Sequence, residues 1–206
     1  LLIFILILSQ GLIGWYMVKS GLTNNVTVSH YRLAFHLFTA FIIFSSLVWI
    51  FINNFTNENI NFLQINTKFL VLKILIFLIF AQIIIGAFVS GLDAGRIYQS
   101  WPLMNGNYFP DDHSLKNLFN FNKPSFVQFV HRNIAYLVFF FTVYLGFFIY
   151  RKKINRLYNS YLIFLFFIIL QVLLGVSTLL SNLNIVFASS HQISSIFLVA
   201  CSLQLY

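Results

Sequence analysis

Three histidines, with the residues spaced around them, are the groups in this sequence that could do chemistry. A Gln followed four residues later by a Gly occurs three times, and the apolar segment after each pair contains one histidine. The pairs are Gln10 with Gly14, Gln82 with Gly86 and Gln171 with Gly175, and the histidines are His36, His131 and His191. Neutral imidazole is a common axial ligand of haem iron, and a porphyrin can take one on each face. The repeat therefore predicts that these histidines are haem-iron ligands on helices of one bundle.

Other roles for these residues remain open from the sequence alone. A histidine between packed helices is often only a hydrogen-bonded polar residue, and the three Gln side chains suit the same role. Zinc is disfavoured, because no Cys, Asp or Glu lies near the histidines to complete a tetrahedral set. The one cysteine, Cys201, lies in an apolar segment, and a single cysteine excludes an intrachain disulfide.

Two arginines beside the histidines are candidate partners for the acidic groups of a porphyrin. Arg132 directly follows His131, and Arg32 lies four residues before His36, on the same helix face. A guanidinium pairs well with a carboxylate such as a haem propionate. The alternative for both is an arginine whose long stem lets its charge reach the membrane surface.

The composition indicates that lipid surrounds most of the chain. Of 206 residues, 60% are hydrophobic and only 8% are charged, whereas soluble domains carry about 25% charged residues. Six segments approach the roughly 20 apolar residues that cross a bilayer: 1–18, 33–52, 74–92, 126–150, 157–180 and 185–206. The sequence therefore predicts an all-α, polytopic transmembrane helix bundle, and it excludes a soluble enzyme or a nucleic-acid binder despite the net charge of +8.

The loops orient these segments and set the depth of the histidines. The only strong basic cluster lies at 151–156 and marks a cytoplasmic loop, because Lys and Arg accumulate on that side. The three segments with histidines then all enter from the outer face, which places each imidazole about 5 to 9 Å into the membrane. The chain is accordingly interpreted as three hairpins of one design.

Two longer connections differ in character. The outer loop at 91–125 contains Pro102, Gly106 and Pro110, which predict ordered turns over a site, with a disordered connector as the alternative. The stretch 53–69 is rich in Asn and predicts a linker between two halves of the protein.

Several strings, in order over nearly the whole chain, resemble the haem A synthase family of respiratory membranes. They are GWYMVKSGL at 14–22, YRLAFHL at 31–37, GLDAG at 91–95, WPLMNGNYFPDD at 101–112, VQFVHR at 127–132, LGVSTLL at 174–180 and HQ at 191–192. The resemblance implies eight helices in two similar four-helix bundles. Residues 1–52 would be the second half of the N-terminal bundle, 53–69 the linker and 70–206 the C-terminal bundle.

The resemblance also implies the sites and the reaction. A haem b would lie between His131 and His191, and His36 would belong to the site of the substrate, haem O. Arg132 and Arg32 are the further contacts that we expect at these two sites. The family is an oxidoreductase that converts haem O to haem A for cytochrome c oxidase, oxidising the ring D methyl group to a formyl group by successive hydroxylations, while haem b transfers electrons.

The resemblance further implies partners and a location. The partners are haem O, the lipid bilayer, haem O synthase, the assembly machinery of cytochrome c oxidase and a second copy of the chain. The location is the bacterial plasma membrane, with the mitochondrial inner membrane as the alternative.

The sequence departs from the family at its beginning. The family's first hairpin contains a carboxylate, with an assigned catalytic role, shortly before a histidine, and neither has a counterpart here. We therefore expect another hairpin before residue 1, so that 206 residues are about three quarters of a four-hairpin protein, with no activity alone. Two rival predictions remain: a cytochrome b-like electron carrier or membrane anchor, which binds haem without modifying it, and a transporter or structural assembly factor, which binds none.

Overall fold

Six long α-helices make up most of the protein. The computed structural model describes residues 1–21, 27–56, 70–112 and 119–206. The helices are α1 (Leu2–Gly21), α2 (His30–Thr56), α3 (Leu70–Gly91), α4 (Pro124–Arg151), α5 (Asn155–Leu180) and α6 (Ile185–Leu205), and a short 3-10 helix, η2 (Ala94–Arg96), follows α3. All six α-helices are long and apolar enough to cross a membrane. The predicted all-α, polytopic helix bundle is confirmed for the described residues.

The observed helices extend slightly beyond the predicted apolar segments. The largest differences are four residues, at the start of α3 and at the end of α2, which continues to Thr56. Each added residue forms another backbone hydrogen bond, so a helix continues past the end of its apolar segment. The predicted linker at 53–69 therefore begins inside α2, and its remainder, 57–69, lies outside the described residues.

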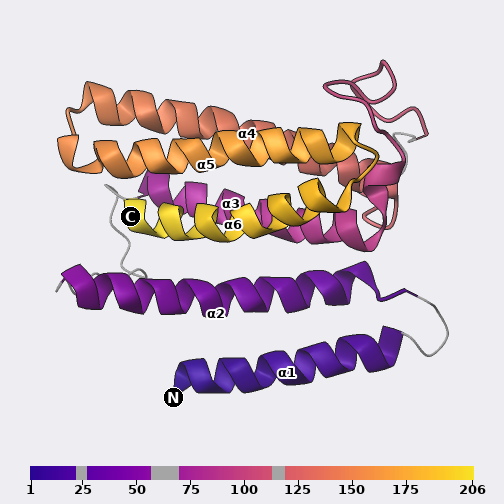
Figure 1. Ribbon diagram of the computed structural model, residues 1–206, viewed down its shortest axis with the longest axis horizontal. Helices are drawn as coiled ribbons and strands as arrows, with labels where there is room; N and C mark the ends of the chain where they lie inside the picture. Colours follow the sequence, from indigo (N-terminus) through magenta and orange to yellow (C-terminus); the bar gives the residue numbers. More distant parts are fainter. Residues whose placement is uncertain (22–26, 57–69, 113–118) are drawn as a thin grey trace.

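The last four helices pack as a ring. Helix α3 packs on α4, α4 on α5, α5 on α6, and α6 again on α3, so that α4 and α6 stand at opposite corners. Helix α2 lies against α3 and α6, and α1 lies against α2 at the edge of the molecule (Figure 1). The helix axes are nearly aligned, and successive helices run antiparallel, as expected for a membrane bundle.

The two ends of the bundle differ. The turn between α4 and α5, with Arg151, Lys152 and Lys153, lies at the left of Figure 1, and we call this the basic end. The segment 92–112 and the turn between α5 and α6 lie at the right, and we call this the loop end. The starts of α2, α4 and α6 are all at the loop end, which is the arrangement that the topology prediction requires.

The fully packed core occupies the half of the bundle nearer the basic end. Its buried side chains come from the first half of α3 and α5 and from the second half of α4 and α6, together with one residue of α2. They are Phe41, Leu72, Leu75, Ile76, Ile79, Val138, Leu145, Ile149, Tyr161, Phe164, Ile168, Leu198, Val199, Leu203 and Leu205. Dense apolar packing of this kind fixes the relative positions of the four helices.

The outer loop is an ordered cap in its described part, 91–112. Tyr98 and Met104 are 2% and 1% exposed, and Met104 pairs with Asn107 through two backbone hydrogen bonds of 2.7 and 3.1 Å. The carbonyl of Tyr98 accepts hydrogen bonds from Gln128 Nε2, at 2.8 Å, and from Arg132 Nη2, at 3.1 Å. This part of the loop is thus fastened to the start of α4.

Candidate functional site

The three histidines lie at one depth in the bundle. His36, His131 and His191 follow the starts of their helices by six, seven and six residues, which corresponds to about 9 to 10 Å along each axis. Because these three helices all start at the loop end (Figure 1), the imidazoles share one level. All three side chains are partly buried.

Each histidine ring rests on the glycine of its repeat. A Cβ atom built on Gly14 would lie 3.0 Å from His36 Cε1, one on Gly86 3.2 Å from His131 Cε1, and one on Gly175 3.1 Å from His191 Cε1. Such distances are tighter than ordinary van der Waals contact, so any larger residue would push the imidazole away. The glycines of the repeat are therefore the surface on which the rings lie, and each ring packs on the helix that precedes its own.

The Gln side chains of the first two repeats tie the same pairs of helices. Gln10 Nε2 donates to the carbonyl of His36 at 2.9 Å and lies 3.5 Å from His36 Nε2. Gln82 Nε2 donates to the carbonyl of His131 at 3.0 Å and lies 3.3 Å from His131 Nε2. The interpretation of these amides as links between helices holds for Gln10 and Gln82.

The third repeat is built differently. His191 Nδ1 donates to the main-chain carbonyl of Gln171 at 3.1 Å, and Ser194 Oγ donates to the carbonyl of His191 at 3.1 Å. The Oε1 atom of Gln171 is buried, without a hydrogen-bond partner among the described residues. A proton on Nδ1 leaves the lone pair of a neutral imidazole on Nε2, the state in which a histidine binds iron.

His131 and His191 lie at one level on opposite corners of the ring of four helices. They belong to α4 and α6, which do not follow one another around the ring. His36 lies outside this ring, on α2, with its ring against α1. The structure therefore brings together two of the three predicted ligands and places the third in a separate pair of helices.

At the level of the histidines the ring has no fully buried residue. No residue is fully buried at 80–86 of α3, 129–137 of α4, 169–180 of α5 or 185–193 of α6. We call these residues the histidine layer; it is about 10 to 18 Å tall. The core closes it on one side, and the buried residues Ser125, Phe126, Val127 and Gln128 close it on the other.

A planar macrocycle fits the chemistry of this layer. The imidazoles of His131 and His191 come from helices at opposite corners of the ring. Each packs on a glycine, where any larger side chain would displace it. The layer also contains buried polar atoms without hydrogen-bond partners in the described part of the chain, namely His131 Nδ1, Gln82 Oε1, Gln171 Oε1 and Arg132 Nε. Buried polar groups without partners are costly and often mark a place where another group binds. The donor set, two neutral nitrogens in an apolar surrounding, suits haem iron.

Among the described residues, no group of three or more His, Cys, Asp and Glu side chains is placed to hold a metal ion.

The two arginines contact protein groups. The Arg132 guanidinium donates to the carbonyl of Tyr98 and lies 3.5 Å from the carbonyls of Pro102 and Leu103. Arg32 lies over the ring of Tyr16, 5.3 Å from its centroid, and so links α2 to α1. Both contacts favour a positioning role at the loop end, and the predicted pairing with haem propionates stays a prediction.

The outer cap places an unusual tyrosine above the histidine layer. The Tyr98 hydroxyl donates to the carboxylate of Asp111 and lies 3.4 Å from that of Asp112. Burial, this hydrogen bond and the two negative charges raise the pKa of Tyr98 to about 12. Tyr98 thus stays neutral and bonded at physiological pH, which favours a closed cap.

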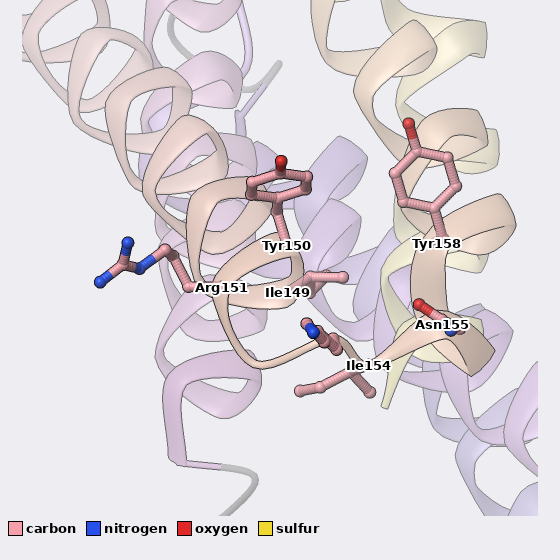
Figure 2. A pocket seen from close by; sticks show the side chains of 7 residues that line it. Ile149, Tyr150, Arg151, Ile154, Asn155 and Tyr158 are labelled. Atoms are coloured by element: carbon pink, nitrogen blue, oxygen red, sulfur yellow. The ribbon is translucent and has the colours of Figure 1, made fainter.

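A separate cavity of about 600 Å³ lies at the basic end, between the end of α4 and the start of α5. Figure 2 shows Tyr150 and Tyr158 at its sides and Arg151 directed away from it. Ile149, which lines it, is 18 residues beyond His131 on α4, or about 27 Å along the helix. This cavity has no part in the chemistry of the histidines.

Sequence reasoning missed residues that belong to the site. Thr39 and Ser194 each lie three residues after a histidine, with the hydroxyl within hydrogen-bond distance of its carbonyl. The Thr39 hydroxyl also reaches Gln10 Oε1, and its single proton can serve only one of these two acceptors at a time. The shared spacing was the available signal. Gln128 was missed because its partner, the Tyr98 carbonyl, is 30 residues away in a loop.

Comparison with known proteins shows the family to which the chain is similar. The profile of the COX15-CtaA family, described as a cytochrome oxidase assembly protein, matches residues 1–203. A heme A synthase of Pelagibacter ubique (strain HTCC1062) is 43% identical over 206 residues, covering 96% of this chain and 58% of that protein. One of Rickettsia felis (strain ATCC VR-1525 / URRWXCal2) is 39% identical over 201 residues, covering 96% and 60%. The chain thus spans about three fifths of the length of these relatives.

Proposed function

The chain belongs to the COX15-CtaA family of cytochrome oxidase assembly proteins, and from this premise we propose that it acts in haem A synthesis as an integral membrane protein. Relatives at 39 to 43% identity are heme A synthases of bacteria, which favours a bacterial plasma membrane. The substrate of the proposed reaction is haem O. The product carries a formyl group where haem O has the ring D methyl group, and successive hydroxylations account for that change.

The observation that carries the proposal is the position of His131 and His191, at one level on opposite corners of the ring of four helices. These two side chains would hold a haem b, one from α4 and one from α6. A haem with two imidazole ligands supplies one-electron transfer. His36, with Arg32 beside it on α2, would belong to the haem O site, which supports the division of the chain into a substrate part at 1–52 and a haem b part at 70–206.

The protein groups have distinct tasks in this proposal. In neutral His191 the lone pair lies on Nε2, because Nδ1 donates to the Gln171 carbonyl. The apolar core excludes water on one side of the layer. The cap at 91–112, fastened by Gln128 and Arg132, excludes water on the other side, where haem propionates would need a cationic partner such as Arg132.

Spectroscopy of single variants tests the ligand pair. The protein is expressed with haem b, purified in detergent and examined by optical and electron paramagnetic resonance spectra. The unmodified protein should give a low-spin signal with two imidazole ligands, and His131→Ala and His191→Ala should each lose it. His36→Ala is the matched control, because its ring lies against α1, and should keep the haem b signal. Full low-spin haem b in both His131→Ala and His191→Ala would overturn the assignment.

A second function, a haem-binding electron carrier or membrane anchor, would use the same two histidines and would need no carboxylate within the helices. Co-expression with a haem O synthase separates the two functions. Accumulation of haem A supports the synthase, whereas haem b binding with no haem A formed supports the carrier.

The remaining partners follow from the proposed reaction. Haem O synthase would supply the substrate, and the assembly machinery of cytochrome c oxidase would receive the product. A second copy of the chain is also proposed as a partner.

A further inference from the structure

The side-chain nitrogen of Gln82 contacts two atoms of His131. Its side-chain nitrogen lies 3.0 Å from the His131 carbonyl oxygen and 3.3 Å from His131 Nε2. One amide group of α3 therefore contacts both the main chain and the ring of a residue on α4. An amide nitrogen carries two N–H groups and accepts nothing, so one can face each acceptor.

The contact with the ring selects its protonation state. Because Gln82 presents a donor, His131 Nε2 must be the acceptor, and the proton of the neutral imidazole lies on Nδ1. The lone pair on Nε2 is the one with which a neutral imidazole binds iron. The carbonyl contact does not involve the ring, so it can hold α4 against α3 whether or not the ring nitrogen is coordinated.

The same contact recurs at the equivalent position of the first repeat. Gln10 Nε2 lies 2.9 Å from the His36 carbonyl and 3.5 Å from His36 Nε2, and Thr39 fixes the orientation of that amide by donating to its oxygen. Ile134 takes the corresponding place after His131. Gln82 Oε1 consequently has no partner in the described structure, and the amide is held by its nitrogen alone.

The third repeat provides an internal control. Gln171 has the same sequence position relative to Gly175 that Gln82 has relative to Gly86. His191 is nevertheless oriented by the main-chain oxygen of Gln171, and its own carbonyl is bonded by Ser194. Replacing the side chain of Gln171 therefore leaves the hydrogen bonds of His191 in place, whereas replacing that of Gln82 removes those of His131.

We propose that Gln82 is a positioning residue that sets the orientation and tautomer of His131 for haem ligation. The proposal rests on the proposed function, because it concerns the same haem ligand. Outer partners of metal-binding histidines typically change metal affinity by about 10- to 100-fold. Gln82 would act in this way through its bond to the His131 carbonyl, which remains when iron replaces the Gln82 N–H at Nε2.

The test compares Gln82→Leu with Gln171→Leu in the protein purified with haem b. Haem loss is followed by transfer to excess apomyoglobin, and the spin state by electron paramagnetic resonance. Gln82→Leu should lose haem at least about tenfold faster and show a high-spin fraction, while Gln171→Leu should stay within about twofold of the unmodified protein. Gln82→Met, which keeps the length of the side chain but has no hydrogen-bond donor, should behave like Gln82→Leu and guards against a folding defect of the leucine variant.

The outcomes separate this inference from the proposed function. Haem loss and spin state in Gln82→Leu and Gln82→Met that match the unmodified protein would overturn the role of Gln82 alone. An equal effect of Gln171→Leu would also overturn it, because a general packing defect would then explain both. An unchanged spectrum of His131→Ala would overturn the ligand assignment itself, and the role of Gln82 with it.

Discussion

The contact between a histidine ring and a bare glycine is the smallest unit of the histidine layer. In each repeat the glycine and the histidine lie on two successive helices, and the contact between them explains why both recur together. A glycine in a helix costs about 0.5 to 1 kcal/mol relative to alanine, so three of them at one level need a compensating role. The close approach of the three rings provides that role.

Gly86→Ala and Gly175→Ala should weaken haem binding. The new Cβ atoms would lie 3.2 and 3.1 Å from the Cε1 atoms of His131 and His191, so each ring must shift away from the helix of its glycine. Overpacking costs about 1 kcal/mol or more, which corresponds to about fivefold faster haem loss. The measurement is haem transfer to apomyoglobin at constant temperature.

Gly11→Ala is the matched control for these two variants. A Cβ atom on Gly11 would meet nothing within 4 Å, so this change should leave haem loss unchanged and stabilise α1 slightly through its better helix propensity. Haem loss in Gly86→Ala no faster than in Gly11→Ala would contradict the role given to the glycines.

At the scale of elements, the cap at 91–112 depends on a neutral Tyr98. The pKa of Tyr98 is raised to about 12, chiefly by burial and then by the Asp111 hydrogen bond and the charges of Asp112 and Asp111, whereas an unfolded tyrosine ionises near 10. A raised pKa means that its contribution to cap stability is complete below about pH 10 and is lost as the pH rises through about 12.

Alkaline titration checks this prediction. Tyrosinate absorbance is recorded for the unmodified protein and for Tyr98→Phe, and the difference between the two curves isolates Tyr98. Its midpoint should lie near pH 12. A midpoint near 10 would show that the hydroxyl is exposed and that the cap is open in solution.

The contact between α4 and α5 predicts a second sensitive glycine. A Cβ atom on Gly146 would overlap the hydroxyl end of Tyr161, and this hydroxyl donates to the Thr142 carbonyl at 3.2 Å. Gly146→Ala should therefore destabilise the bundle by about 1 to 3 kcal/mol, measured as reversible unfolding in mixed detergent. Gly146→Ala with Tyr161→Leu should recover part of the loss, and no recovery would place the strain elsewhere.

For the whole molecule, the loop end should face outward and the basic end the cytoplasm. Only the turn at 151–156 has a dense cluster of Lys and Arg, and such clusters stay on the cytoplasmic side. In a Cys201→Ala background, Gln99→Cys should react with a membrane-impermeant maleimide in intact cells. Asn155→Cys should react only after lysis, and the reverse pattern would invert the topology.

Much of this architecture could be predicted from the sequence. The length and apolarity of the segments predict six helices, and each predicted end lies within four residues of the observed one. This works because helix formation in lipid depends on local hydrogen bonding and hydrophobic length. The level of the histidines follows from the same count of residues, as does the common direction of the three helices that contain them.

Only the tertiary structure decides which of these residues meet. The closed order of α3, α4, α5 and α6 sets His131 opposite His191 and leaves His36 on α2, and packing between helices fixes this order. Gln82 and Gln171 have the same position in the sequence repeat. Gln82 nevertheless bonds His131 through its side chain, whereas Gln171 bonds His191 through its main-chain carbonyl. Residue types and local spacing are properties of the chain, whereas facing pairs depend on contacts between helices far apart in sequence.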